Sequence, residues 1–185
     1  MKSSLRIAGV GGQGAITAGH LLGTAAVLYD HKEAVVTEGY SPYVTGGWSR
    51  ADVVISDSPI DYPMVTKLDG LVTMYQDGLD SNLALLRQDA VVLGEKRMVD
   101  PTRVKGRRVL LVPATEVAES LGRKVLTNIV LLGALTAVMP LVSLESLKTA
   151  VSSRFPKAAE INTRALDQGF ELGRRLDTRA EGIPV

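Results

Sequence analysis

A glycine-rich segment near the N-terminus, Gly9 to Gly14 with the sequence GVGGQG, constrains the fold of this chain more than any other feature. It follows an apolar run, Leu5 to Val10, and precedes a stretch with apolar residues at helical spacing. Gly9, Gly11 and Gly14 have the G-x-G-x-x-G spacing of a strand–turn–helix unit, in which glycine permits a tight turn and a close approach of ligand to backbone. The N-terminus of the following helix would attract an anion. The segment therefore predicts an α/β fold with anion binding of some kind at Gly11 to Gly14.

Other interpretations of this glycine segment stay open. A dinucleotide site needs an acidic residue at the end of the second strand, and Glu38 occupies that place, somewhat further along than the usual spacing. A tight strand-to-helix turn without any ligand explains the same glycines. A P-loop nucleotide hydrolase is excluded, because no Gly-Lys-Ser/Thr follows the loop.

Short apolar runs alternate along the chain with longer amphipathic stretches, a pattern typical of layered α/β domains. We expect one three-layer Rossmann-like domain over residues 1–185, with a mostly parallel sheet, helices on both faces and a helical C-terminal third. Residues 39–49 should form a loop, 95–107 a surface excursion and 177–185 a flexible tail. The predicted strands are 5–10, 34–38, 51–56, 70–75, 90–93 and 108–112, and the predicted helices are 13–29, 77–87, 113–121, 125–139, 144–152 and 158–176.

The composition excludes several classes of protein. With 21 basic and 20 acidic residues the net charge is +1, so no basic field for nucleic acid is expected. The absence of cysteine excludes disulfides, iron–sulfur ligation and thiol catalysis within this chain and favours a cytoplasmic location. No signal peptide is predicted, since glycines interrupt the N-terminal apolar run. The uncharged run 125–144 contains Asn128, Gly133 and Pro140, so we interpret it as a buried core helix and expect no membrane partner.

A second unusual segment, Tyr40 to Arg50, holds the only tryptophan of the chain and the pair Gly46-Gly47. Its aromatic residues are suited either to anchor a partner protein or to pack the loop onto its own domain. Sequence alone leaves both uses open.

Together these motifs resemble the gamma subunit of 2-oxoacid:acceptor (ferredoxin) oxidoreductases and the gamma-type domain of single-chain pyruvate:ferredoxin oxidoreductases. The resemblance runs from about Leu5 to Leu176 with the motifs in the family's order. It rests on the glycine segment, on Ala18-Gly19, and on the Gly-Gly pair that leads into Ser49 to Ser56. It rests also on Asp69-Gly70-Leu71-Val72, on Pro113-Ala114-Thr115 and on the helix led by Asn128.

The second loop departs from the family pattern Glu-x-Arg-Gly-Gly. Here the stretch is Tyr43-Val44-Thr45-Gly46-Gly47, so Thr45 stands where the family has arginine. Arg50, close by in sequence, is the candidate to replace any anion contact of that arginine.

The resemblance implies oxidative decarboxylation of a 2-oxoacid to an acyl-coenzyme A by a multi-subunit complex. Thiamine diphosphate and iron–sulfur clusters are then expected on partner subunits, with ferredoxin as electron acceptor. The partners implied are alpha and beta subunits, and a delta or ferredoxin-type subunit. This chain would dock on the thiamine-binding subunits, bind no cofactor firmly itself and help to form the coenzyme A site. Pyruvate, 2-oxoglutarate, branched-chain and aryl 2-oxoacids all fit this description.

No catalytic or metal-binding residue is predicted in this chain. Its two histidines, His20 and His31, have no recognisable acid–base partner in the sequence. Arg123 and Lys124 are interpreted as solvated helix-end charges, and Asn128 either as a ligand contact or as a hydrogen-bonded core amide. The candidate cofactor-binding residues lie in both glycine segments and on the apolar helix: Gly9, Gly11, Gly12, Gln13, Gly14, Gly46, Gly47, Arg50 and Asn128.

Two rival functions remain at this point. A free-standing NAD(P)-binding oxidoreductase domain would rest on the glycine segment and Glu38. A purely structural assembly subunit would use its loops only to pack against partners.

Overall fold

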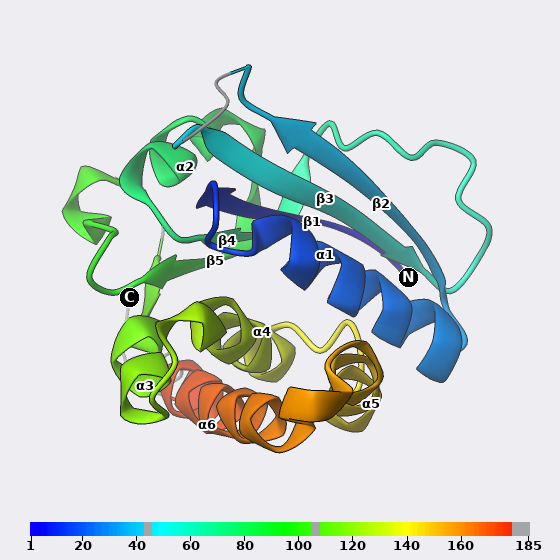
Figure 1. Cartoon of the computed structure of the whole chain (residues 1–185). Coiled ribbons are helices and arrows are strands. Elements are labelled where there is room, and N and C mark those ends of the chain that lie inside the picture. The colour runs from blue at the N-terminus through cyan, green and yellow to red at the C-terminus, as the bar shows by residue number, and fades with distance from the viewer. Residues whose placement is uncertain (43–45, 105–107, 179–185) are drawn as a thin grey trace.

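The described residues, 1–42, 46–104 and 108–178 of a computed structural model, form a six-stranded sheet with strand order β2-β3-β1-β4-β5-β6 (Figure 1). β1, β4, β5 and β6 are parallel, whereas β3 runs antiparallel to both β1 and β2. The sheet is therefore mixed and mostly parallel, in agreement with the expected fold class. The strand bounds are β1 (Lys2–Val10), β2 (Glu33–Tyr40), β3 (Trp48–Ser56), β4 (Leu68–Thr73), β5 (Leu86–Glu95) and β6 (Leu110–Val112).

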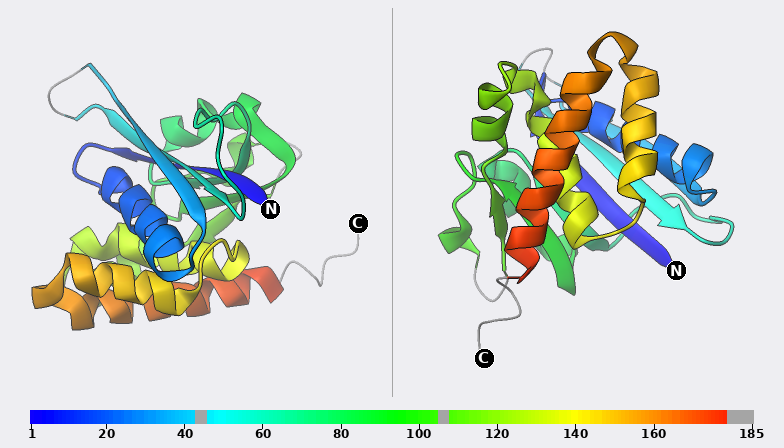
Figure 2. Two further views of the ribbon diagram at one scale, coloured as in Figure 1. Left: turned by 90° about the vertical axis from the view of Figure 1, so that its right-hand side faces the viewer. Right: turned by 90° about the horizontal axis from the view of Figure 1, so that it is seen from below.

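Helices pack on the sheet unequally on its two faces. On one face α1 and α4 lie against the strands, and α3, α5 and α6 form the outer layer (Figures 1 and 2). On the other face the short α2 and nearby turns cover a smaller apolar cluster around Leu71, Leu79 and Val92. The helix bounds are α1 (Ala15–Thr24), which continues as a π-helical turn (Ala25–Tyr29), α2 (Gln76–Asp80), α3 (Ala114–Ser120), α4 (Thr127–Val138), α5 (Leu144–Arg154) and α6 (Ala159–Thr178).

The apolar helix α4 is buried between the sheet and α6, which confirms the expected core helix. Its residues from Asn128 to Thr136 are buried without interruption. Backbones of α4 and α6 touch closely: a Cβ at Gly133 would lie 2.1 Å from the Leu166 carbonyl oxygen, and one at Gly169 would lie 2.0 Å from that of Val130. Because α4 has protein on all sides, its sequence is apolar all round. Within the described part of the chain, no helix has the length and apolarity needed to cross a membrane.

The structure corrects several predicted boundaries. The expected loop 39–49 is shorter than predicted, since β2 extends to Tyr40 and β3 begins at Trp48, and these two strands form a hairpin; residues 43–45 of the expected loop lie outside the described residues. The helix predicted to reach Arg87 ends at Asp80, and β5 already begins at Leu86, because Leu86 is buried and pairs with Leu68. Exposed polar residues just after Leu86 hide this strand from a pattern search. The expected tail is wrong at 177–178, which belong to α6, and residues 179–185 lie outside the described residues.

Candidate functional site

The glycine segment connects β1 to α1, and hydrogen bonds join it to the end of β4 and to the second glycine segment. The side chain of Gln13 turns back, accepting a hydrogen bond from the Val10 amide at 2.7 Å and donating one to the Met74 carbonyl at 3.2 Å. The amide of Gly11 donates to the carbonyl of Gly47 at 2.8 Å, so the two glycine segments found in the sequence are in direct contact.

Gly14 is the position at which this turn requires glycine. Its φ is +77°, in the left-handed region, and a Cβ there would lie 2.4 Å from Nδ2 of Asn128. Asn128 is buried, and its amide donates to the Gly14 carbonyl at 3.1 Å and accepts from the amide of Ile129 at 2.9 Å. The amide of Asn128 therefore fixes the glycine turn to α4, as expected for a hydrogen-bonded core amide.

A cavity of about 600 Å³ opens between the glycine turn, the hairpin tip and the N-terminal ends of α4 and α6. Most of its surface is apolar, as is usual for small-molecule sites. Arg123 is the single charged residue among the described residues that line it. The lining residues are Gly11, Gly12, Gly14, Ala15, Ile16, Thr17, Tyr40, Ser41, Gly46, Gly47, Trp48, Ser49, Arg123, Val125, Leu126, Asn128, Ile129, Phe155, Ala158, Ile161 and Asn162.

A second cavity of about 380 Å³ lies on the other side of the glycine turn, at the carboxyl ends of β4 and β5. Gly12 and Val125 line both cavities. The buried Glu95 stands in the second cavity with its carboxylate already bonded to the amides of Thr115 and Arg97, at 3.1 and 2.8 Å. Its lining is completed by Gln13, Met74, Arg97, Met98, Thr115, Lys124 and Thr127.

Three cations of the described chain line these cavities, and two of them stand within four residues of the start of α4. Arg123 lines the larger cavity and Lys124 the smaller one, and both side chains are exposed. The third, Arg97, is also exposed, but it is held by Glu119 at 2.7 Å and by Glu116 at 3.7 Å, and the hydrogen bond that it donates to Glu119 raises the pKa of its guanidinium.

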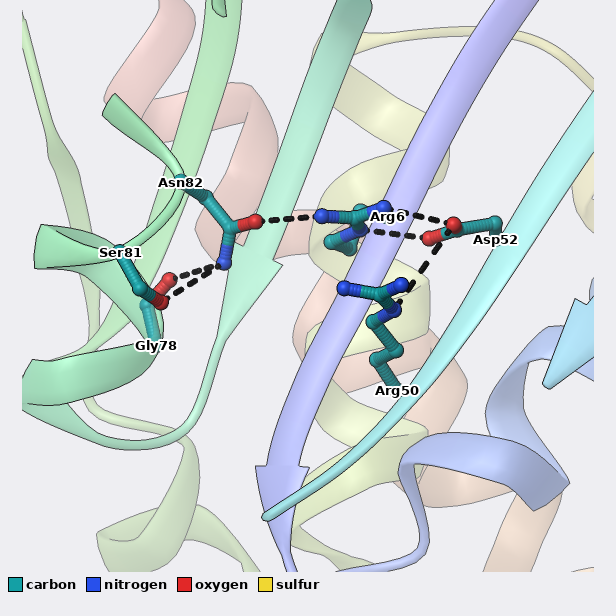
Figure 3. A network of polar contacts seen from close by, with 6 residues as sticks. All are labelled: Arg6, Arg50, Asp52, Gly78, Ser81 and Asn82. Atoms are coloured by element: carbon teal, nitrogen blue, oxygen red, sulfur yellow. Dashed lines mark hydrogen bonds and ion pairs between the residues drawn. The ribbon is translucent and has the colours of Figure 1, made fainter. Parts of the chain in front are cut away.

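Arg50 is directed away from both cavities. Its guanidinium lies over the Trp48 ring, 5.4 Å from the ring centroid, and its Nε is 4.0 Å from the carboxylate of Asp52. Asp52 belongs to a buried network on the face of the sheet that carries α2 (Figure 3). There Arg6 donates two hydrogen bonds to Asp52, at 2.6 and 2.7 Å, and one to Asn82 at 2.6 Å.

Glu38 has partners that differ from those of a dinucleotide site. It contacts Nε2 of His20 at 2.5 Å and accepts a hydrogen bond from the Tyr40 hydroxyl, and these bonds, the one from Tyr40 first, lower the pKa of its carboxyl. In addition β3 lies between β1 and β2, so Glu38 is not on the strand next to the glycine turn. Both observations count against a ribose contact by Glu38.

The structure brings together most of the candidate residues. Gly11, Gly12, Gly14, Gly46, Gly47 and Asn128 line the larger cavity, and Gln13 lines the smaller one. Gly9 packs under the turn, where a Cβ would lie 2.9 Å from Cε of Met74, and Arg50 lies outside.

Several cavity residues were not among the candidates from sequence. Arg123, Tyr40, Phe155 and Asn162 come from four separate segments. The sequence offered two signals for them: the basic pair before the apolar helix, and the aromatic segment that begins at Tyr40. In the described part of the chain no three His, Asp or Glu side chains gather as a metal site.

A family model described as pyruvate ferredoxin/flavodoxin oxidoreductase matches residues 4–172 of the chain. A 2-oxoglutarate synthase subunit KorC from Methanocaldococcus jannaschii is 41% identical over 180 residues, which cover 95% of this chain and 96% of that protein.

Two solved structures resemble the chain over nearly all its length. The gamma subunit of a keto/oxoacid ferredoxin oxidoreductase from Geobacter sulfurreducens has a TM-score of 0.84 and 34% identity, covering 95% of this chain and 98% of that one. The 2-oxoglutarate:ferredoxin oxidoreductase from Magnetococcus marinus, with 2-oxoglutarate, coenzyme A and succinyl-CoA bound, has a TM-score of 0.85. At 20% identity, with 94% of this chain and 31% of that chain covered, it shows a shared fold.

Proposed function

The chain belongs to the pyruvate ferredoxin/flavodoxin oxidoreductase family as a gamma subunit of a 2-oxoacid:ferredoxin oxidoreductase, and we propose that its complex oxidises 2-oxoglutarate to succinyl-CoA. The observation that carries the choice of oxoacid is the 41% identity to a 2-oxoglutarate synthase subunit over almost the whole of both chains. The other subunits of the complex are its partners.

The division of labour in the proposed complex is the one that the family resemblance implies, and the residues of this chain agree with it. Without cysteine it supplies no thiolate for an iron–sulfur cluster. Thiamine diphosphate and the clusters are assigned to alpha, beta and delta or ferredoxin-type subunits, with ferredoxin as the acceptor of the electrons. The gamma subunit docks on the thiamine-binding subunits.

The glycine turn is assigned to the coenzyme A site. It combines the N-terminus of α1, whose first amides have no partner within the helix, with a largely apolar cavity of about 600 Å³. Phosphate oxygens suit such amides, and the uncharged parts of the coenzyme suit the apolar wall.

Isolation of the complex tests the oxoacid. The tagged chain is purified from its native cells with its partners, and coenzyme A-dependent reduction of ferredoxin is measured with 2-oxoglutarate, pyruvate, a branched-chain and an aryl 2-oxoacid. We expect the highest kcat/KM with 2-oxoglutarate. A higher value with another oxoacid would overturn the choice of substrate. Recovery of the chain alone with tight NAD binding would favour the dinucleotide-binding alternative.

A charge at Gly12 tests the site. A Cβ at Gly12 would meet no atom within 4 Å, and its φ of +90° is tolerated better by Asp and Asn than by other residues. Gly12→Asp adds a negative charge where phosphate is assigned, and Gly12→Asn is its uncharged control. We expect Gly12→Asp to raise the KM for coenzyme A about tenfold or more, the effect of losing one charge-assisted contact, and Gly12→Asn to raise it much less. An unchanged KM in both variants with impaired assembly would favour a purely structural subunit.

A further inference from the structure

The two cavities on either side of the glycine turn share a common border. Gly12 lines both from one side and Val125 from the other, and Val125 is 67% exposed although it is apolar. Its side chain therefore stands on the ridge between a cavity of about 600 Å³ and one of about 380 Å³. Each volume falls within the range of small-molecule sites.

Positive charge is concentrated at this ridge. Arg123 faces the larger cavity and Lys124 the smaller one, directly before Val125 in the chain. Both side chains are exposed, as is that of Arg97 in the smaller cavity, but Arg97 is already ion-paired with Glu119. The N-terminus of α1 adds partial positive charge beside Gly12.

Arg50, the residue expected to replace the family arginine at position 45, makes its contacts outside the two cavities. Arg50 stacks on Trp48 and approaches Asp52, and it lines neither cavity. With threonine at position 45, the cations that line the two cavities in the described structure are Arg123, Lys124 and Arg97, of which Arg97 is held by Glu119.

We propose that the two cavities form one cleft for a single elongated ligand, whose diphosphate binds between Arg123 and Lys124 over Gly12 and whose two arms occupy the two cavities. This inference rests on the proposed function, because coenzyme A has this layout, with a diphosphate between adenosine 3′-phosphate and pantetheine. Arg123 and Lys124 are then binding residues for coenzyme A, and Val125 supports the ligand where it crosses the ridge.

The double variant Arg123→Gln/Lys124→Gln tests the assignment in the purified complex. It removes two positive charges, and Lys2→Glu is a control with the same change in net charge. Lys2 is exposed at the opposite end of β1, about 26 Å along the strand from Val10. We expect the double variant to raise the Kd for coenzyme A at least about tenfold and to weaken its dependence on salt, and Lys2→Glu to do neither.

Pantetheine, which lacks phosphate, separates direct contact from a structural effect. Its Kd should be the same in the wild-type complex and in the double variant. An equal rise in the Kd of coenzyme A and of pantetheine would overturn the assignment. So would dissociation of the gamma subunit from the complex on gel filtration with coenzyme A binding unchanged. If the wild-type complex did not bind coenzyme A at all, the proposed function would fail first, so the two failures are distinguishable.

Continuity of the cleft has its own test. Val125→Trp enlarges the side chain on the ridge and so narrows the passage between the two cavities. We expect this variant to bind coenzyme A several-fold more weakly, while 3′,5′-ADP and pantetheine, offered separately, still bind. Unchanged binding of coenzyme A to this variant would show that the ligand does not cross the ridge.

Discussion

Arginine residues in two regions of this molecule have opposite surroundings. Arg6 is 4% exposed in the sheet, and Asp52 and Asn82 accept its hydrogen bonds (Figure 3). Asn82 is held in turn, donating to the Gly78 carbonyl at 2.7 Å. Arg123, at the cleft, is exposed and stands beside a glycine turn.

The difference shows which charges serve the fold and which are available to a ligand. A charge away from water must be compensated within the protein, and in the described residues no buried side-chain nitrogen or oxygen lacks a partner. The buried network therefore has no capacity left for another anion. Arg123 and Lys124 are instead exposed to solvent at the cleft, so their charges are accessible to a phosphate.

The largest expected effect is on stability, when the buried ion pair of Arg6 and Asp52 is broken. Asp52→Ala leaves the Arg6 guanidinium buried and without its carboxylate, so we expect about 3–5 kcal/mol less free energy of unfolding. The double variant Arg6→Met/Asp52→Leu removes both charges and should be clearly more stable than Asp52→Ala. Urea denaturation measures both. Equal losses in the two variants would contradict the idea that the uncompensated charge is the cause.

Gly14 lies where the fold and the cleft meet, and an intermediate effect is expected there. Gly14→Ala combines a left-handed φ with a clash against Asn128, so we expect a loss of about 1–3 kcal/mol in the free energy of unfolding and a higher KM for coenzyme A. In the background Asn128→Ala the clash is absent, so the further loss caused by Gly14→Ala should be smaller. Strictly additive losses would show that the backbone conformation alone limits this position.

The smallest expected effect concerns Glu38 at the rim of the cleft, where Tyr40 lines the larger cavity. Hydrogen bonds from Tyr40 and His20 hold the pKa of the Glu38 carboxyl below its usual 4.5. The stabilisation is thus fully present above that value and is lost as the pH falls through the lower pKa of the folded state. Glu38→Gln should lower the Tm at pH 7, by less as the pH falls below 4.5. Glu33→Gln, at an exposed position on the same strand, is the control, and an equal pH dependence in both variants would contradict the prediction.

Local patterns in the sequence determined much of this protein. Alternation of apolar runs predicted the layered α/β fold, because burial of one face imposes its period on each strand and helix. The glycine spacing located the turn between β1 and α1, and the apolar run 125–144 predicted the buried α4. These features depend on neighbours in the chain, so sequence patterns report them directly.

The tertiary structure decided what depends on residues far apart in the chain. Strand order, register and helix packing determine three contacts of this kind: the hydrogen bond of Gly11 to Gly47, the hydrogen bond of Asn128 to Gly14, and the position of Arg50 near Asp52. Insertion of the antiparallel β3 between β1 and β2 separated Glu38 from the glycine turn. Packing of α4 placed Arg123 and Lys124 beside that turn. Sequence patterns carry no record of such pairings, because the free energy that selects them comes from burial and hydrogen bonding across the whole core.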